Sequence, residues 1–234
     1  MKDCLPCKAK RKNARPWMVG GIAFLGMSFL GGASAQESPW TLRAGPAGVF
    51  WDQSSKVTVA GSGVPGAEIN LNNNYTLGLD IGYDLSDRWT VHFAFGVPPK
   101  VKLTSGGALN TMVPPLTGRL GDVRYGPALL SAVYKFNPTG GFVPYVGAGV
   151  TYMHIFSSKG GDIQGLDVDD AWGGILQAGF TVPLQDRWSF FFDVRKLLLK
   201  TKASGTLPAL GGPPASVSIR LNPLVVHAGL EYRF

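Results

Sequence analysis

The sequence predicts an all-β protein, an eight-stranded antiparallel transmembrane β-barrel preceded by a cleavable signal peptide. Eight segments alternate apolar side chains with small or polar ones, as strands with one apolar face do. The connections between them alternate between short turns and long loops, which is typical of bacterial outer-membrane barrels. The N-terminus combines a basic region, an apolar run and a small-residue cleavage site, which is typical of exported proteins.

Residues 1–35 are interpreted as the signal peptide and residues 36–234 as the outer-membrane barrel. The apolar run over 17–30 is followed by Ala33-Ser34-Ala35, an A-x-A site before Gln36. A transmembrane helix needs about 20 apolar residues, so this run is too short to be one. We therefore expect the mature chain to leave the cytoplasm.

The charge and the cysteines exclude several classes of function. Of the formal charge of +7, the first 16 residues carry +5, so only +2 remains for the rest of the chain, and no nucleic-acid partner is expected. Cys4 and Cys7, the only cysteines, lie in the predicted signal peptide, so no disulfide or thiolate chemistry is expected in the mature chain. The spacing of Asp162, Asp167, Asp169 and Asp170 matches no calcium loop, and Gly147-Ala148-Gly149 lacks the third glycine and the following helix of a dinucleotide site, so no metal or cofactor is expected. No mature segment holds 18 consecutive apolar residues, so no transmembrane helix is expected.

The first three predicted strands follow in chain order from Trp40. Residues 40–51 begin with apolar side chains at every second position, and residues 69–83 show the clearest alternation of the chain. A tight turn at 84–88 leads into residues 89–96, where aromatic and small side chains alternate.

The fourth and fifth strands are the arms of a hairpin over 122–156. Their turn, 137–141, reads Asn-Pro-Thr-Gly-Gly, which a helix would not tolerate. Four aromatic residues gather beside this turn, where a membrane hairpin places its interfacial girdle. They are Tyr134, Phe136, Phe142 and Tyr145.

The last three predicted strands are residues 169–182, a strand that begins at 188, and residues 226–234. A tight turn at 184–187 joins the first two, and its Asp186-Arg187-Trp188 repeats the earlier Asp87-Arg88-Trp89. Long loops are expected at 52–68, 98–121, 157–168 and 203–215, which are rich in Gly, Pro and Ser. An even number of strands with this alternation places both ends of the chain and the short turns on the periplasmic side.

A membrane barrel fits the pattern better than a soluble barrel does. Several strands reach 14 or more residues, beyond the usual soluble length of about five or six. A soluble barrel would also place its charges outside, whereas here charged side chains, including Arg195, share the face opposite the aromatic ones.

The motifs of the chain resemble the OmpW family of eight-stranded outer-membrane proteins. The resemblance covers nearly the whole mature chain and implies a narrow barrel whose lumen admits small hydrophobic molecules across the outer membrane. The motifs that carry it are Gly82-Tyr83, Pro114-Pro115, the run Phe142-Val143-Pro144-Tyr145-Val146-Gly147-Ala148-Gly149, Asp170-Ala171-Trp172-Gly173, Asp193-Val194-Arg195-Lys196, Asn222-Pro223 and the terminal Tyr232-Arg233-Phe234.

Strand parity divides the predicted lumen into two halves. Near the periplasmic turns the inward residues form a charged plug: Arg43, Asp80, His92, Lys135, Asp193, Glu231 and Arg233. Toward the outside they form an apolar vestibule: Val123, Tyr125, Leu129, Met153, Ile155, Ile175, Leu197 and Leu199. Trp172 is added to this set because the resemblance places it near the ligand path, although simple alternation points it at lipid. An apolar vestibule above a charged floor suits a greasy ligand that enters from outside and leaves sideways into the membrane.

The sequence favours the first of three functions, with the other two as alternatives, and we expect no enzymatic activity. The first is passive passage of small hydrophobic molecules; the second is a structural or receptor barrel without transport. The third is a lipid A-modifying enzyme, for which His154 with Ser157 or Ser158 would be the pair to test.

The expected partners are a small hydrophobic ligand, outer-membrane lipid with lipopolysaccharide, and the barrel assembly machinery. Leu230, Tyr232 and Phe234 resemble the C-terminal signal by which that machinery recognises barrels. Lys196, Lys200 and Lys202 are candidates for contact with anionic headgroups at the outer rim, although a solvated strand end explains them almost as well.

Overall fold

A computed structural model describes residues 38–111, 116 and 118–234, so the predicted signal peptide lies outside the described residues. The described chain forms strands and two short 3-10 helices, and none of its helices is long and apolar enough to cross a membrane. The elements are β1 (Trp40–Phe50), β2 (Gln53–Val59), β3 (Ser62–Gly63), β4 (Ala67–Leu71), β5 (Asn74–Asp84), β6 (Trp89–Gly96), β7 (Lys100–Gly107), η1 (Ala108–Thr111), β8 (Arg119–Lys135), β9 (Val143–Gly160), β10 (Gln164–Val168), β11 (Ala171–Gln185), β12 (Trp188–Thr206), η2 (Pro208–Leu210), β13 (Pro214–Leu221) and β14 (Leu224–Arg233).

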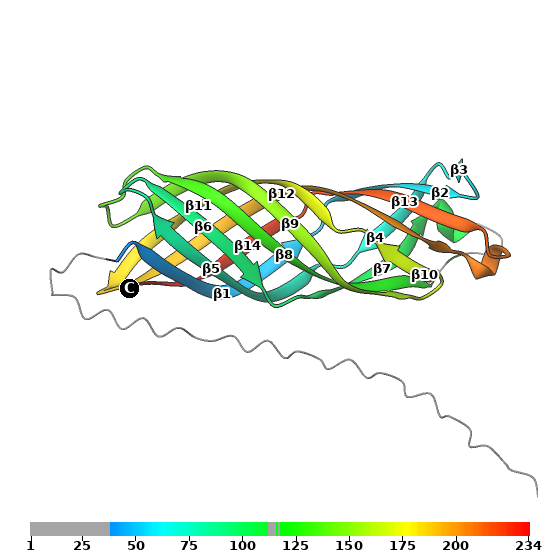
Figure 1. Ribbon diagram of the computed structural model, residues 1–234, viewed down its shortest axis with the longest axis horizontal. Helices are drawn as coiled ribbons and strands as arrows, with labels where there is room; N and C mark the ends of the chain where they lie inside the picture. The colour runs from blue at the N-terminus through cyan, green and yellow to red at the C-terminus, as the bar shows by residue number, and fades with distance from the viewer. Residues whose placement is uncertain (1–37, 112–115, 117) are drawn as a thin grey trace, which may run out of the picture. The chain divides into compact units, whose positions relative to one another are not determined.

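Eight of these strands close into an antiparallel barrel, which confirms the predicted fold class. The order around the wall is β1, β5, β6, β8, β9, β11, β12 and β14, and β14 pairs back onto β1. Closure gives each of the eight strands a partner on both sides, as a sheet in lipid requires, because no water is available there to hydrogen-bond the backbone. Figure 1 shows the short turns beside the C-terminus at one end, with β3 and β10 near the other.

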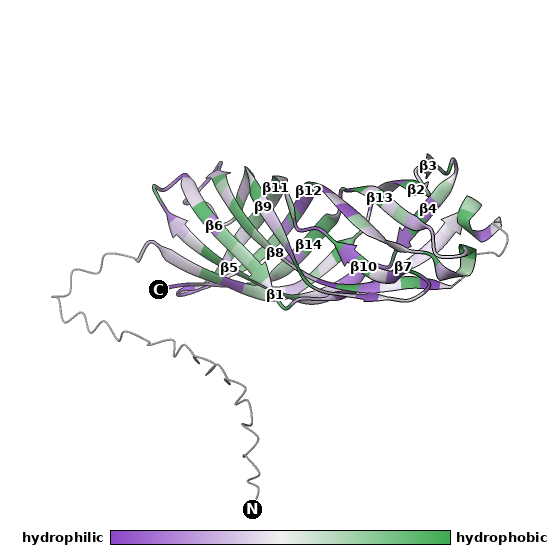
Figure 2. Ribbon diagram, turned by 45° about the vertical axis from the view of Figure 1, so that its right-hand side comes forward, coloured by the Kyte–Doolittle hydropathy of each residue, from purple (hydrophilic) through white to green (hydrophobic). Residues whose placement is uncertain are grey.

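The strands carry one face for lipid and one for the lumen, visible in Figure 2 as successive hydrophobic and hydrophilic segments. Aromatic pairs surround the end that holds the short turns, with ring centroids 4.8 Å apart for Trp40 and Tyr83 and 4.9 Å apart for Trp188 and Tyr232. These half-exposed rings form the interfacial girdle typical of outer-membrane barrels.

The prediction of four long irregular loops is wrong, because much of each segment forms strands. They contain β2, β3, β7, β10 and the outer ends of β8, β9 and β12, which pair with one another or with β4 and β13 beyond the membrane barrel. Their many Gly, Ser and Pro residues concealed a weak alternation, such as Val57 with Val59 and Val101 with Leu103. Backbone pairing needs no large side chain, so these segments continue the barrel outward as a narrower cap (Figure 1).

Gly45 lies where β1 and β14 approach each other closely. A methyl group added at Gly45 would lie 1.9 Å from the carbonyl oxygen of Ala228 and 2.8 Å from the Cα of Gly229, all of them backbone atoms. Backbone in a closed barrel cannot move aside without disturbing the pairing around the wall.

We predict that Gly45→Ala lowers the free energy of unfolding by about 1–3 kcal/mol, because the added methyl group overpacks the wall. Gly141→Ala is the matched control, since nothing lies within 4 Å of its added methyl group. Urea unfolding of the two variants in detergent micelles measures the difference, and equal stability would contradict the prediction.

Candidate ligand path through the barrel

A hydrogen-bonded network of charged side chains closes the periplasmic half of the lumen. Arg43 on β1 donates from Nε to Glu231 on β14 (2.5 Å) and from Nη1 to the hydroxyl of Tyr145 on β9 (3.1 Å). The Tyr145 hydroxyl donates in turn to Asp193 Oδ2 on β12 at 2.7 Å. Arg195 links the other side of this carboxylate to Asp80 on β5, with Nε 2.8 Å from Asp193 Oδ1 and an ion pair to Asp80.

Five strands therefore contribute to one chain of contacts across the lumen. Its members are at most about a tenth exposed. The guanidinium carbon of Arg43 also lies over the ring of Phe191, 5.2 Å from the ring centroid. Buried charges are stable only when they are paired and hydrogen-bonded, which this network achieves. We call it the floor: Arg43, Asp80, Tyr145, Asp193, Arg195 and Glu231.

A second ion-pair cluster lies nearer the turns. Asp84 accepts from Lys135 Nζ at 2.7 Å, from Arg233 at 2.9 Å and from the Thr90 hydroxyl at 2.5 Å. The predicted plug residues Lys135 and Arg233 are thus inside the barrel but belong to this cluster. Together the floor and the Asp84 cluster block the axis with fixed charges.

Several buried polar atoms around the floor have no protein hydrogen-bond partner in the described structure. They include both ring nitrogens of His92, the side-chain amide of Gln177 and the hydroxyl of Thr151. Polar lumen atoms of this kind are commonly satisfied by buried water. His92, predicted as part of the plug, is inward and buried but joins no ion pair.

The outer half of the lumen is apolar, and the structure brings the predicted vestibule residues together there. Val123, Tyr125, Leu129, Met153, Ile175, Leu197 and Leu199 are all buried in one cluster, and Ile155 packs half-buried against it. Trp172 is the exception: it is 71% exposed on the lipid-facing side, where its ring lies tilted against that of Tyr152 with 4.7 Å between the centroids. The prediction of Trp172 as a lumen residue is wrong. β11 alternates regularly from its first residue, so Ala171 faces the lumen and Trp172 faces outward.

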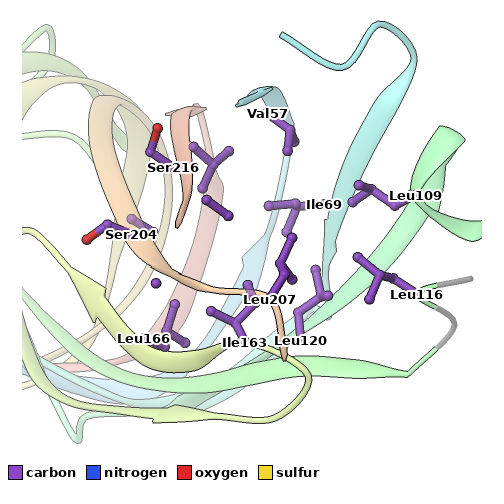
Figure 3. A pocket seen from close by; sticks show the side chains of 14 residues that line it. Val57, Ile69, Leu109, Leu116, Leu120, Ile163, Leu166, Ser204, Leu207 and Ser216 are labelled. Atoms are coloured by element: carbon purple, nitrogen blue, oxygen red, sulfur yellow. The ribbon is translucent and has the colours of Figure 1, made fainter. Parts of the chain in front are cut away.

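Three small cavities follow one another along this apolar column. The outermost, of about 30 Å³, is closed by Leu109, Leu116 and Leu207 and is shown in Figure 3. The middle one, of about 40 Å³, lies among Trp51, Tyr125, Met153 and other apolar side chains. The innermost, of about 60 Å³, reaches down to Asp80, Arg195 and His227 of the floor region.

The innermost cavity also touches an interruption in the barrel wall. β6 pairs with β8 as far as Ala94 and Leu129, and pairing resumes only where Lys100 of β7 meets Arg124. We call the intervening residues 95–99 and 125–128 the seam. The one backbone hydrogen bond outside the ladders that joins its two sides in the described structure runs from the Tyr125 N–H to the Pro99 carbonyl at 3.3 Å.

Prolines explain why the seam stays unpaired. Pro98, Pro99 and Pro127 have no N–H group, so they cannot donate to a ladder. Phe95, Val97, Pro99 and Pro127 line the innermost cavity from the seam, and Phe95 and Val97 are also exposed on the outer surface. The lumen therefore meets the lipid-facing surface through apolar side chains at this point.

The structure gives His154 a carboxylate partner. Asp170 accepts from the Tyr152 hydroxyl, from the Ile155 N–H at 2.7 Å and from His154 Nδ1 at 2.9 Å. These hydrogen bonds, the one from Tyr152 first, lower the pKa of Asp170 to about 2. Neither Ser157 nor Ser158 is hydrogen-bonded to His154, so this part of the described chain forms no serine–histidine pair.

No three His, Cys, Asp or Glu side chains gather as metal ligands within residues 38–111, 116 and 118–234. The predicted terminal signal residues Leu230 and Phe234 are exposed on the outside of the barrel, with Tyr232 half-buried beside them. Their role in insertion stays a prediction.

Sequence reasoning missed two groups of lumen residues. Tyr145 was assigned to the aromatic girdle, but it is only 2% exposed and bridges Arg43 to Asp193. Its inward parity in the run Tyr145, Gly147, Gly149 was the available signal. Much of the outer column comes from the predicted loops and from the unassigned residues 217–221, where alternation over 55–59, 101–103 and 217–221 could have indicated it.

The comparisons with known proteins agree on one family. The OmpW family matches residues 36–234. The chain belongs to the OmpW family. It is similar to the dibenzothiophene metabolism operon protein PahQ of Pseudomonas aeruginosa, with 36% identity over 86% of this chain and 90% of that protein. It is also similar to the outer membrane protein AlkL of Ectopseudomonas oleovorans, with 32% identity over 78% and 76% of the two chains.

Two solved structures share the architecture of this OmpW-family barrel. The outer membrane protein OprG of Pseudomonas aeruginosa superposes with a TM-score of 0.77 at 26% identity, covering 85% of this chain and 97% of that one. The structure of AlkL in lipid bilayers superposes with a TM-score of 0.67 at 30% identity, covering 87% and 93%. The protein is thus an outer-membrane β-barrel, as its alternating strands predicted.

We predict that Arg195→Leu lowers the free energy of unfolding by about 3–5 kcal/mol, because Asp80 and Asp193 lose their buried counter-ion. Arg88→Leu is the matched control: Arg88 is exposed at a turn, and its loss costs less than about 1 kcal/mol. Urea unfolding in micelles measures both.

Arg195→Leu should also raise single-channel conductance in planar bilayers, because the floor would no longer close the axis. A variant as stable and as poorly conducting as the parent would contradict the role of the floor as a closed barrier.

Proposed function

We propose that this OmpW-family barrel gives small hydrophobic molecules passive passage through the outer membrane, by entry at the outer end and lateral exit through the seam. The observation that carries the proposal is an apolar column that ends on a charged floor, with its innermost cavity at an interruption of the wall. An apolar solute gains free energy at each step that removes it from water.

The floor favours lateral over axial passage. To continue along the axis, an apolar solute would have to separate Arg195 from Asp80 or Arg43 from Glu231, and each separation leaves a buried charge unpaired. Sideways, the solute meets only Phe95, Val97 and the prolines of the seam. The membrane beyond them is as apolar as the solute.

The cavities are smaller than the solutes, so passage requires side chains to move. A cavity of about 150 Å³ holds a benzene molecule, whereas the three cavities here measure about 30, 40 and 60 Å³. Trp51 and Tyr125 are polar-tipped members of the column, and both donate to Asn74. Most of the column is built from aliphatic side chains, and Met153 adds a flexible thioether. Such side chains can change rotamer one at a time while a solute advances.

The relatives suggest the solutes to use. PahQ and DoxH are named for a dibenzothiophene metabolism operon, and dibenzothiophene is a flat, uncharged aromatic compound. We therefore choose fused aromatic hydrocarbons of this size as the first test substrates.

We predict that Leu129→Trp slows uptake of such a hydrocarbon at least about tenfold, because the indole fills the innermost cavity. Leu130→Trp is the matched control, since Leu130 is the next residue of β8 and is 49% exposed to lipid. Uptake by liposomes that enclose an apolar-binding acceptor measures both variants. Equal uptake with Leu129→Trp, Leu130→Trp and empty liposomes would contradict passage and favour a structural or receptor barrel.

A second variant tests the lateral exit. Pro127→Val restores an N–H group and a β-branched side chain, so it should extend the pairing of β8 across the seam and slow uptake several-fold. Pro183→Val, in β11 beside a periplasmic turn, is the control and should leave uptake unchanged. If Pro127→Val leaves uptake intact while Leu129→Trp abolishes it, the exit is elsewhere.

A further inference from the structure

Basic side chains gather on the outside of the barrel above the lipid-facing residues. Lys200 and Lys202 lie on β12, Arg220 on β13 and Lys56 on β2, and all four are exposed. We call these four residues the basic patch. It lies toward the end of the barrel away from the short turns, which is the extracellular end of an outer-membrane barrel.

The strand register places like charges against each other. Lys200 lies directly opposite Arg220, and Lys202 and Lys56 flank Ser218 in the adjacent row. Like charges opposite each other in a sheet are destabilising unless an anion lies between them. Such an arrangement is therefore evidence for an anionic ligand.

Protein carboxylates do not neutralise the patch. Lys196, four residues before Lys200 in β12, forms an ion pair with Asp52 at 3.1 Å. No member of the basic patch forms an ion pair with any described residue. Asp167 flanks β12 on its other side, opposite Ser204, and forms no ion pair with the patch.

An open groove joins the patch to the lipid-facing surface. It has a volume of about 510 Å³ and is lined by Lys200, Arg220 and Asn222 together with Trp172 and Leu198. Trp172 and Leu198 are 71% and 48% exposed, so the groove is cationic on one side and apolar on the other. This combination fits an amphiphile with a phosphate next to an acyl chain.

We propose that the groove binds a phosphorylated lipid of the outer leaflet, with the lipid A phosphate on Lys200 and Arg220 and an acyl chain along Trp172 and Leu198. Lys and Arg are the side chains that bind phosphate, and each cation near an anionic lipid contributes about fivefold in affinity. Lys202 and Lys56 extend the same field toward a second phosphate. The site is outside the lumen and does not depend on passage of a solute.

The opposite wall offers a control with similar charges. There Lys102 and Lys159 lie on either side of Asp122, which lies opposite both in the register of β7, β8 and β9. Lys100 and Arg124 also lie opposite each other on that wall, but Asp122 is two residues away on the same face of β8. Asp122 forms its ion pair with Arg119, and Lys102 and Lys159 lie opposite this carboxylate and not opposite another cation. Removing Lys102 and Lys159 therefore takes away the same formal charge without removing a pair of cations that lie opposite each other.

The test counts lipid bound to the mature chain, folded in detergent micelles, by native mass spectrometry. The probes are bisphosphorylated lipid A, the same lipid without phosphates, and inorganic phosphate. Lys200→Ala with Arg220→Ala should weaken binding of bisphosphorylated lipid A at least about tenfold, and Trp172→Ala should weaken it less. Lys102→Ala with Lys159→Ala should change it less than about twofold.

Heat-modifiable migration on a denaturing gel confirms that each variant is folded, and Lys200→Gln with Arg220→Gln provides a second, more conservative loss of charge. Equal binding by the parent and both double variants would overturn the site. An equal loss of lipid A binding in Lys102→Ala with Lys159→Ala would overturn the specific site, because binding would then depend only on the total charge of the protein. Equal affinity for inorganic phosphate and lipid A would contradict the proposal that the ligand is a lipid, because the apolar side of the groove would then contribute nothing to binding.

Discussion

Pairing of the backbone in lipid is the constraint on which the rest of this structure depends. Because the hydrocarbon core offers no water, each strand must be paired on both sides, and the sheet can satisfy this only by closing on itself. Closure with eight strands gives a lumen just wide enough to be filled by side chains. The character of the protein is therefore set by which side chains fill it.

The lumen has two halves that are packed with different kinds of side chain. Toward the periplasmic turns, Arg43 and Arg195 are held among carboxylates and a tyrosine hydroxyl, so the axis is closed by charges that cannot separate cheaply. Toward the outside, mainly aliphatic and aromatic side chains pack together without ion pairs and leave small cavities between them. The first half resists a solute, and the second can yield to one.

The seam and the basic patch are both departures from the regular wall. At the seam, prolines remove donors, so the wall is held by apolar packing where the ladder should be. At the patch, the ladder is regular but its outward side chains repel one another. The seam is held by apolar packing and one backbone hydrogen bond, and no described carboxylate pairs with the cations of the patch. These two places carry the proposals of lateral exit and of lipid binding.

The sequence by itself determined the barrel, the number of its strands and the face on which most side chains lie, because alternation with a period of two is a local property of the chain. It predicted the inward charges Arg43, Asp80 and Asp193 and the apolar residues Leu129 and Leu197 on this basis. Only the tertiary structure decided which of these meet, that Tyr145 joins the floor and that the outer loops contain strands. Those outcomes depend on register between strands distant in the chain, and register is set by the closure of the whole cylinder.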